Sequence, residues 1–250
     1  CSIADVIGLA IRLSETGIGD YWDDVDRLAR NQFVAQQHTT GPDRVIGSFV
    51  INGRPTRIQA DEVAGCCTMN GAQALYYVWS GIMRGDEDHV DVNLLLNRAS
   101  PLMDMDSYLP YEGKVVLKNK AAKTAAVRIP AWVDRKAVTL RINNESAPVV
   151  WSGNRVLLRL LKPSDRVIIQ FPMVTAMEKV IEQISPDGHG GTIQKTELTY
   201  EFKGNTAIDV SPRPAPQEGY VAIYQRDKYR RNKAPMVKKE RFVAKKLIAW

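Results

Sequence analysis

The spacing of apolar residues changes near residue 85, and this change constrains the fold more than any other feature of the sequence. Up to that point apolar residues recur every three or four positions, which is the spacing of one face of an α-helix. Beyond it they form short runs or alternate with polar residues, which is typical of β-strands. The sequence therefore predicts an α+β multidomain chain with a helical part over residues 1–85 and β-structure after it.

Three amphipathic helices are predicted in the first part, over residues 2–13, 20–33 and 68–79. In the first helix, Ile3, Ile7 and Ile11 share one face. Asp20 is the predicted N-cap of the second helix, because its short side chain can accept a hydrogen bond from a first-turn N–H group. Together these apolar faces are wide for so short a helical part, so we expect them to belong to a larger helical body.

Strands are predicted in the next part over residues 90–96, 114–117, 125–129, 138–142, 156–160 and 166–171. Turn residues such as Asn143-Asn144 separate them, so an antiparallel β-sandwich over residues 86–175 is favoured over alternating strands and helices. Weaker strands are predicted over residues 195–202, 206–210 and 221–224. Residues 176–250 are therefore expected to form a further β-rich segment with a basic tail.

The charge of the chain is concentrated in that tail. The net charge is +6, and residues 225–250 hold ten Lys and Arg against two acids, so residues 1–224 sum to −2. Because no nucleic-acid-binding module surrounds the tail, a solvated terminus is expected and no nucleic-acid partner is predicted. No apolar run approaches the ~18 residues that cross a bilayer. The sequence is compatible with a cytoplasmic or a secreted or periplasmic location and indicates no oligomeric state.

The three cysteines, Cys1, Cys66 and Cys67, are the strongest candidates for a chemical role. An odd number with two adjacent members disfavours a disulfide framework and favours thiolate metal ligands or a reactive thiol. Three buried, inert thiols are the alternative. Cys66 and Cys67 come just before the third predicted helix, where backbone N–H groups and the helix dipole stabilise a thiolate.

Zinc needs about four ligands, and the three thiolates would supply three of them. The other candidates by residue type are His38, His89 and His189, and none of them belongs to a motif with metal-ligand spacing. Cys1 could instead be the lipidated first residue of a processed bacterial protein. An amphipathic helix follows Cys1 directly, without a polar tether, so the ligand role is favoured. Since the chain does not begin with Met, we expect it to be part of a longer protein.

The segment Gly65-Cys66-Cys67-Thr68-Met69-Asn70-Gly71 resembles the Gly-Cys-Cys-x-x-Asn-Gly motif of glycoside hydrolase family 127, whose type activity is β-L-arabinofuranosidase. Further segments are similar to this family in the same order, namely Val92-Asn93-Leu94, Val127-Arg128-Ile129-Pro130-Ala131-Trp132, and Lys162 to Asp165 with Phe171-Pro172-Met173. The resemblance covers about residues 1–175. One departure is Phe49-Val50-Ile51-Asn52-Gly53, which stands where the family tends to have Tyr-x-Asn-Pro.

The resemblance implies an (α/α)6 barrel, of which residues 1–85 would be a remnant, followed by β-sandwich domains. It also implies a zinc ion held by Cys1, Cys66, Cys67 and a Glu upstream of residue 1, with Cys66 as the nucleophile. The acid/base Glu would likewise lie outside this sequence. The implied activity is retaining hydrolysis of arabinofuranosides or related plant glycans, with a carbohydrate as the substrate.

Two alternatives to a zinc-thiolate glycosidase stay open at this point. The chain lacks the implied acid/base residue, so by itself it is expected to be inactive and could be a carbohydrate-binding or structural module. The three thiols could also serve zinc storage or redox chemistry. Substrate-binding residues are not assigned by the sequence.

Overall fold

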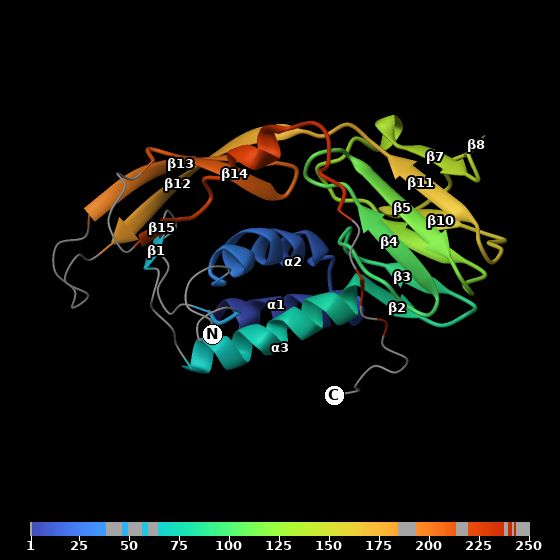
Figure 1. Ribbon diagram of the computed structural model, residues 1–250, viewed down its shortest axis with the longest axis horizontal. Helices are drawn as coiled ribbons and strands as arrows, with labels where there is room; N and C mark the ends of the chain where they lie inside the picture. Colours follow the sequence, from blue (N-terminus) through green and yellow to red (C-terminus); the bar gives the residue numbers. More distant parts are fainter. Residues whose placement is uncertain are drawn as a thin grey trace.

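A computed structural model describes residues 2–38, 47–49, 57–59, 65–184, 194–213, 220–237, 240, 241 and 243. Three helices lie at the centre, with a β-sandwich beside one end of them and a three-stranded sheet over them (Figure 1). The helical elements are α1 (Ser2–Glu15), α2 (Trp22–Leu28), the π-helical turn η1 (Ala29–Phe33) and α3 (Gly65–Ile82). All three predicted helices are therefore present. Cys1 and His189 lie outside the described residues.

Helices α1 and α3 lie side by side and run in the same direction (Figure 1). A Cβ atom added at Gly8 of α1 would lie 3.6 Å from the Tyr77 ring of α3. One added at Gly81 of α3 would lie 3.8 Å from Ile11 Cδ1. From the first contact to the second, the residue number rises in α1 and also in α3, so the two helices are parallel. Helix α2 packs antiparallel on α1.

The starts of α2 and α3 differ from the prediction. Tyr21 occupies the N-cap position of α2 without a side-chain cap. The Asp20 carboxylate accepts a hydrogen bond from the Trp22 N–H at 3.2 Å. Its other hydrogen bonds come from residues of the sandwich. Helix α3 begins at Gly65, so Cys66 and Cys67 lie inside its first turn.

The sandwich consists of two five-stranded sheets. One sheet has the order β2 (Met83–Gly85), β3 (Val90–Val92), β6 (Ala125–Arg128), β10 (Arg155–Leu158) and β9 (Trp151–Ser152). The other has the order β4 (Met103–Ser107), β5 (Lys114–Asn119), β11 (Arg166–Gln170), β7 (Thr139–Ile142) and β8 (Glu145–Ala147), and a 3-10 turn, η2 (Arg135–Ala137), precedes β7. The six strands predicted for this part are confirmed. The pairing of β3 with β6 is parallel, which departs from the expected antiparallel arrangement.

The sequence did not predict β4. In this strand Met103 and Met105 are buried and alternate with Asp104 and Asp106, whose carboxylates bind Lys120 and Lys118. Methionine and aspartate have little β-propensity, so the alternation gave no strand signal. The pairing with β5 decides the conformation of this segment.

The rest of the chain forms β12 (Thr175–Ile184), β13 (Gln194–Lys203) and β14 (Thr206–Ser211), which make the three-stranded sheet. Strand β15 (Tyr220–Ala222) pairs with β1 (Arg57–Gln59), and a 3-10 turn, η3 (Asp227–Arg230), follows it. The β-rich character of this segment is confirmed, although β12 was not predicted. One hydrophobic core runs without interruption from the helices into the sandwich, and a smaller one lies under the three-stranded sheet.

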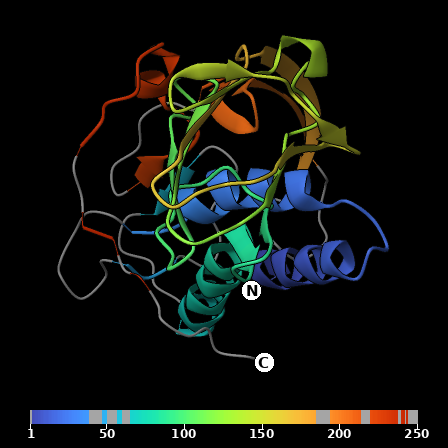
Figure 2. The same cartoon turned by 90° about the vertical axis from the view of Figure 1, so that its right-hand side faces the viewer.

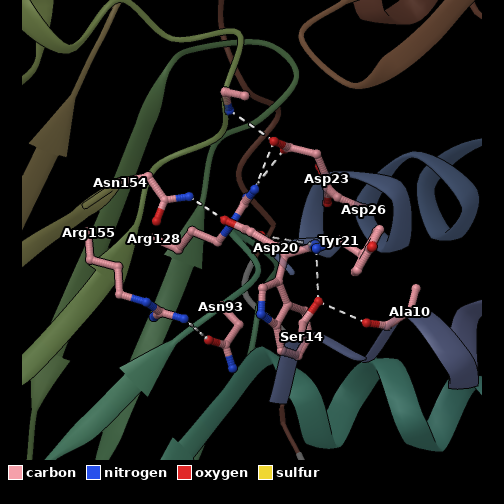
Figure 3. Close-up of polar contacts among 12 residues, drawn as sticks. Ala10, Ser14, Asp20, Tyr21, Asp23, Asp26, Asn93, Arg128, Asn154 and Arg155 are labelled. Carbon is pink, nitrogen blue, oxygen red and sulfur yellow. Dashed lines mark hydrogen bonds and ion pairs between the residues drawn. The ribbon is translucent and has the colours of Figure 1, made fainter. Parts of the chain in front are cut away.

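A buried arginine joins the helices to the sandwich (Figure 3). Arg128 on β6 donates from Nε to both carboxylate oxygens of Asp20 at 2.9 Å and from Nη2 to Asp23 at 2.8 Å. Its side chain is only 4% exposed. Asn154 from the β9–β10 turn also donates to Asp20, and Asn205 donates to Asp23 at 3.0 Å. The helices, the sandwich and the three-stranded sheet thus meet at one polar joint.

The Arg128 joint sets the ionisation of the two carboxylates. Burial alone raises the pKa of Asp23, but the hydrogen bonds and charge of Arg128 outweigh it and hold this pKa below its usual value. The same two effects act on Asp20, and its pKa is lowered as well. Both carboxylates are therefore ionised at neutral pH.

Within the described part of the chain, no helix is both long enough and apolar enough to cross a membrane. Figure 2 shows the sandwich end on, and α1 and α3 lie below it in this view.

Candidate active site

The candidate site is built on the first turn of α3. Cys66 is exposed and Cys67 is half-buried against the main core. The first backbone N–H groups of a helix have no intrahelical acceptor, and they favour a negative charge at this end. Both thiols thus lie at the start of the third helix, inside its first turn.

Phe49 holds this turn in place. Its backbone N–H donates to Thr68 Oγ1 at 3.2 Å, and its ring packs on Gly71, one turn further along α3. The ring is buried and stacks on Phe33 with 4.7 Å between centroids. Phe49 stands where the resembling family tends to have tyrosine. Here its ring supports the site from the core.

The contact between Phe49 and Gly71 predicts the effect of a single added methyl group. A Cβ atom at Gly71 would lie 2.6 Å from Phe49 Cδ2, so Gly71→Ala should lower the free energy of unfolding by about 1–3 kcal/mol. The better helix propensity of alanine, worth about 1 kcal/mol, would offset only part of this loss. Gly65→Ala in the same turn is the matched control, because a Cβ there meets nothing within 4 Å. Urea unfolding of both variants measures the difference, and equal stabilities would contradict the packing.

The start of α1 lies at the same end as the cysteine pair. The contacts Gly8–Tyr77 and Ile11–Gly81 put each residue of α1 level with a residue of α3 about 70 positions later. Ser2, the first described residue of α1, is therefore level with the second turn of α3. At a rise of 1.5 Å per residue, the level of Cys66 is only about 7–9 Å away along the axis.

A cavity of about 970 Å³ follows α1 and α3 from this end toward the sandwich. It begins one turn after Cys66, at Asn70, and Asp5 of α1 also lines it. Half-buried aromatic side chains form part of its wall, namely Tyr76, Tyr77 and Trp79. Aromatic faces and polar groups together are what a sugar-sized ligand needs.

Arg98 closes the sandwich end of this cavity. Its Nη1 donates to the carbonyl oxygens of Trp79, Ser80 and Met83 at 2.8–2.9 Å, which caps the end of α3. Its guanidinium lies over the Trp79 ring, 4.5 Å from the centroid. Burial, with a contribution from the nearby Arg84 charge, lowers the pKa of Arg98 to about 10. Arg98 therefore stays protonated at neutral pH and ties α3 to the sandwich.

Of the histidines considered as metal ligands, the structure describes His38 and His89. His89 lies in the β2–β3 connection, and its Nδ1 is 2.8 Å from Thr124 Oγ1. His38 is buried, and its backbone N–H donates to Ser48. Over the described residues, no three His, Cys, Asp or Glu side chains form a group that could hold a metal ion. Cys66 and Cys67 are thus the part of the predicted ligand set that the structure brings together. Cys1 and His189 fall outside the described ranges.

The sequence did not predict that Phe49, Gly71 and Arg98 support the site. Their roles depend on contacts between residues far apart in the chain. Two of these residues left a signal in the sequence. Phe49 departs from the family pattern, and Gly71 lies inside a predicted helix, where a close approach of another group is a common reason for glycine.

A comparison of the sequence with protein families and with curated proteins finds no match. Solved structures do match in fold. One is described as a GH127 β-arabinofuranosidase, with 17% identity, a TM-score of 0.51, and coverage of 75% of this chain and 32% of that one. Another is a glycoside hydrolase, with 15% identity, a TM-score of 0.50, and coverage of 75% and 33%. A GH127 β-L-arabinofuranosidase from Geobacillus stearothermophilus T6 has 17% identity and a TM-score of 0.47, with coverage of 75% and 32%.

This chain thus spans about a third of the length of these structures. At such low identity the likeness shows a shared fold. The resemblance to family 127 is confirmed at that level.

Proposed function

We propose that this chain contributes the cysteine-bearing part of a retaining glycoside hydrolase of family 127, acting on arabinofuranosides or related plant glycans. Because the chain spans about a third of the matching structures, the proposal concerns a polypeptide that also contains the rest of such a fold. Helices α1, α2 and α3 would then be the last helices of an (α/α)6 barrel. Such a barrel alternates helices of opposite direction. The parallel pair α1 and α3, with α2 antiparallel to α1, is compatible with this alternation.

One observation supports the proposal above the others. The two adjacent cysteines occupy the first turn of α3, at the end where the parallel helix α1 begins. This convergence occurs in a fold shared with glycoside hydrolases. Helix α1 begins at Ser2, directly after Cys1 in the sequence, and the proposal gives Cys1 the role of a third thiolate.

Cys66 is the proposed nucleophile, because it is the exposed member of the pair. Its Sγ would attack the anomeric carbon while the bond to the leaving oxygen breaks, and a carboxylic acid would protonate that oxygen. Water would then displace the thiolate, returning a proton to the carboxylate. Two displacements at one carbon retain its configuration. The carboxylic acid belongs to the part of the fold outside this sequence.

The described donors are compatible with the proposed zinc ion. Thiolates are soft ligands that zinc accepts, and two of them lie in one helical turn with Cys67 half-buried. Cys1, Cys66 and Cys67 would be the ligands from this chain, with a fourth from the rest of the fold. When bound, the metal would keep Cys66 deprotonated at neutral pH.

Metal analysis of the 250-residue chain tests the ligand set. We expect close to one zinc per chain, and Cys67→Ser should weaken binding because a hydroxyl is a poor zinc ligand. Met69→Leu, on an exposed residue of the same turn, is the matched control and should bind zinc as the parent does. Thiols that react equally fast with and without a chelator would contradict the zinc site.

A further inference from the structure

The last strand in the described part of the chain, β15, pairs with β1, which precedes the cysteine pair in the sequence. In the antiparallel ladder between β15 and β1, Tyr220 lies opposite Gln59, Val221 opposite Ile58, and Ala222 opposite Arg57. Only seven positions separate Gln59 from Cys66. Within the described residues, β1 has no other strand partner than β15. The backbone just before the candidate nucleophile is thus held by a strand from the far end of the chain.

A two-stranded ladder is marginally stable by itself, so it depends on what holds β15. The two residues that follow β15 supply apolar contacts. Ile223 and Tyr224 are 4% and 7% exposed and belong to the smaller core under the three-stranded sheet. The Tyr224 ring meets the Tyr200 ring edge to face, with 5.8 Å between centroids. This packing fixes the end of β15 against β13.

Arg226 supplies the polar part of the attachment. Its guanidinium donates to the backbone oxygens of Arg30, Asn31 and Ala207 at 3.1–3.2 Å, and to Asn31 Oδ1 at 3.2 Å. Its own backbone N–H donates to Ile208 at 2.8 Å. Asn31 in turn donates to the Asn205 carbonyl and accepts from the Ala207 N–H. The segment after β15 is therefore bonded to both η1 and β14.

We propose that residues 220–226 form a clamp that positions the chain leading to Cys66. The clamp joins the helices and the three-stranded sheet to β1, while Phe49 holds α3 from the core side. In this proposal the cysteine turn is restrained through β1 as well as through Phe49. The residues of the clamp are positioning residues, and they touch neither substrate nor metal. The consequence for catalysis rests on the proposed function, whereas the positioning itself does not.

Val221→Pro in the 250-residue chain tests the clamp, because proline removes an N–H group and cannot sit within a paired strand. We expect amide exchange at residues 57–59 and at 69–72, the first residues of α3 whose N–H groups bond within the helix, to become at least about tenfold faster. Alkylation of the half-buried Cys67 by iodoacetamide should accelerate to a similar degree. Exchange in β5 and β11 should stay unchanged, which shows that the sandwich is folded.

Val237→Pro is the matched control, since Val237 is 68% exposed and lies beyond the clamp in the same terminal segment. Arg226→Met is a second variant that removes the anchor and keeps β15 intact; it should loosen the same residues. If either variant frees residues 57–59 while exchange and alkylation at the cysteine turn stay at the parent rate, the clamp is overturned. Neither amide exchange nor alkylation needs zinc or substrate. If the chain fails to bind zinc but both rates rise in the variants, the clamp is supported and the proposed function is rejected.

Discussion

Cys66→Ala should abolish glycoside hydrolysis in a polypeptide that joins this chain to the rest of the barrel. Removing the nucleophile of a covalent mechanism typically costs at least about 10³-fold in kcat, because the intermediate can no longer form on its sulfur. The exposed position of Cys66 in the first turn of α3 makes it the thiol that a sugar can reach. The measurement is release of nitrophenol from an aryl arabinofuranoside at saturating substrate.

Three further results decide what a loss of activity means. Gly65→Ala, next to the proposed nucleophile, adds a methyl group into open space and should retain most of the hydrolytic activity. In the absence of zinc, the Cys66→Ala protein should unfold at the same urea concentration as the parent, because the lost thiol is exposed. Incubation of the parent with a slow substrate should leave a mass increase of one sugar on Cys66. Hydrolysis by Cys66→Ala at the parent rate would refute its assignment as nucleophile.

Arg128→Met should be among the most destabilising substitutions in the chain. It leaves Asp20 and Asp23 ionised in a joint from which their common cation is gone (Figure 3). Breaking a fully buried ion pair costs about 3–5 kcal/mol. Because the Asp20 and Asp23 side chains keep 40% and 23% of their exposure, we expect about 3 kcal/mol. Urea unfolding of parent and variant at pH 7 measures the loss.

The pH dependence separates lost charge pairing from lost packing. In the parent, the pKa values of Asp20 and Asp23 are lowered, so the stability that they supply is present above their unfolded values near ~3.9 and is lost as the pH falls through the folded values. In Arg128→Met the largest effect that lowers both pKa values is gone, and burial, which raises them, is opposed only by the remaining hydrogen bonds from neighbouring backbone and asparagine N–H groups. Protonation of the two carboxylates should therefore stabilise the variant. The stability gap should therefore narrow between pH 7 and pH 3. A constant gap would mean that Arg128 acts through packing alone.

An exposed ion pair provides the matched control for this substitution. Lys179 binds Glu197 at 2.7 Å, and their side chains are 71% and 58% exposed. Lys179→Met should change the free energy of unfolding by less than about 1 kcal/mol, since water already solvates both charges. The comparison shows whether burial, and not the mere presence of an ion pair, sets the effect at Arg128.

Local sequence patterns were sufficient for the elements of this protein. The spacing of Ile3, Ile7 and Ile11 predicts α1, and six sandwich strands were predicted from short apolar runs, because these signals need only neighbours a few residues away. The adjacency of Cys66 and Cys67 before a helical pattern located the candidate site for the same reason. Strands such as β4 and β12, whose residues have weak β-propensity, escaped because their partners decide their conformation.

What the tertiary structure decided is which distant segments meet. The Arg128 joint links residues more than 100 positions apart, and β15 reaches β1 from more than 160 positions away. No periodicity encodes such pairs, since an arginine in an apolar strand or a short valine run looks the same whatever it contacts. The sequence by itself determined the helices, most strands and the thiols. Only the packing of the folded chain, in which burial makes each polar partner obligatory, decided how those thiols are held.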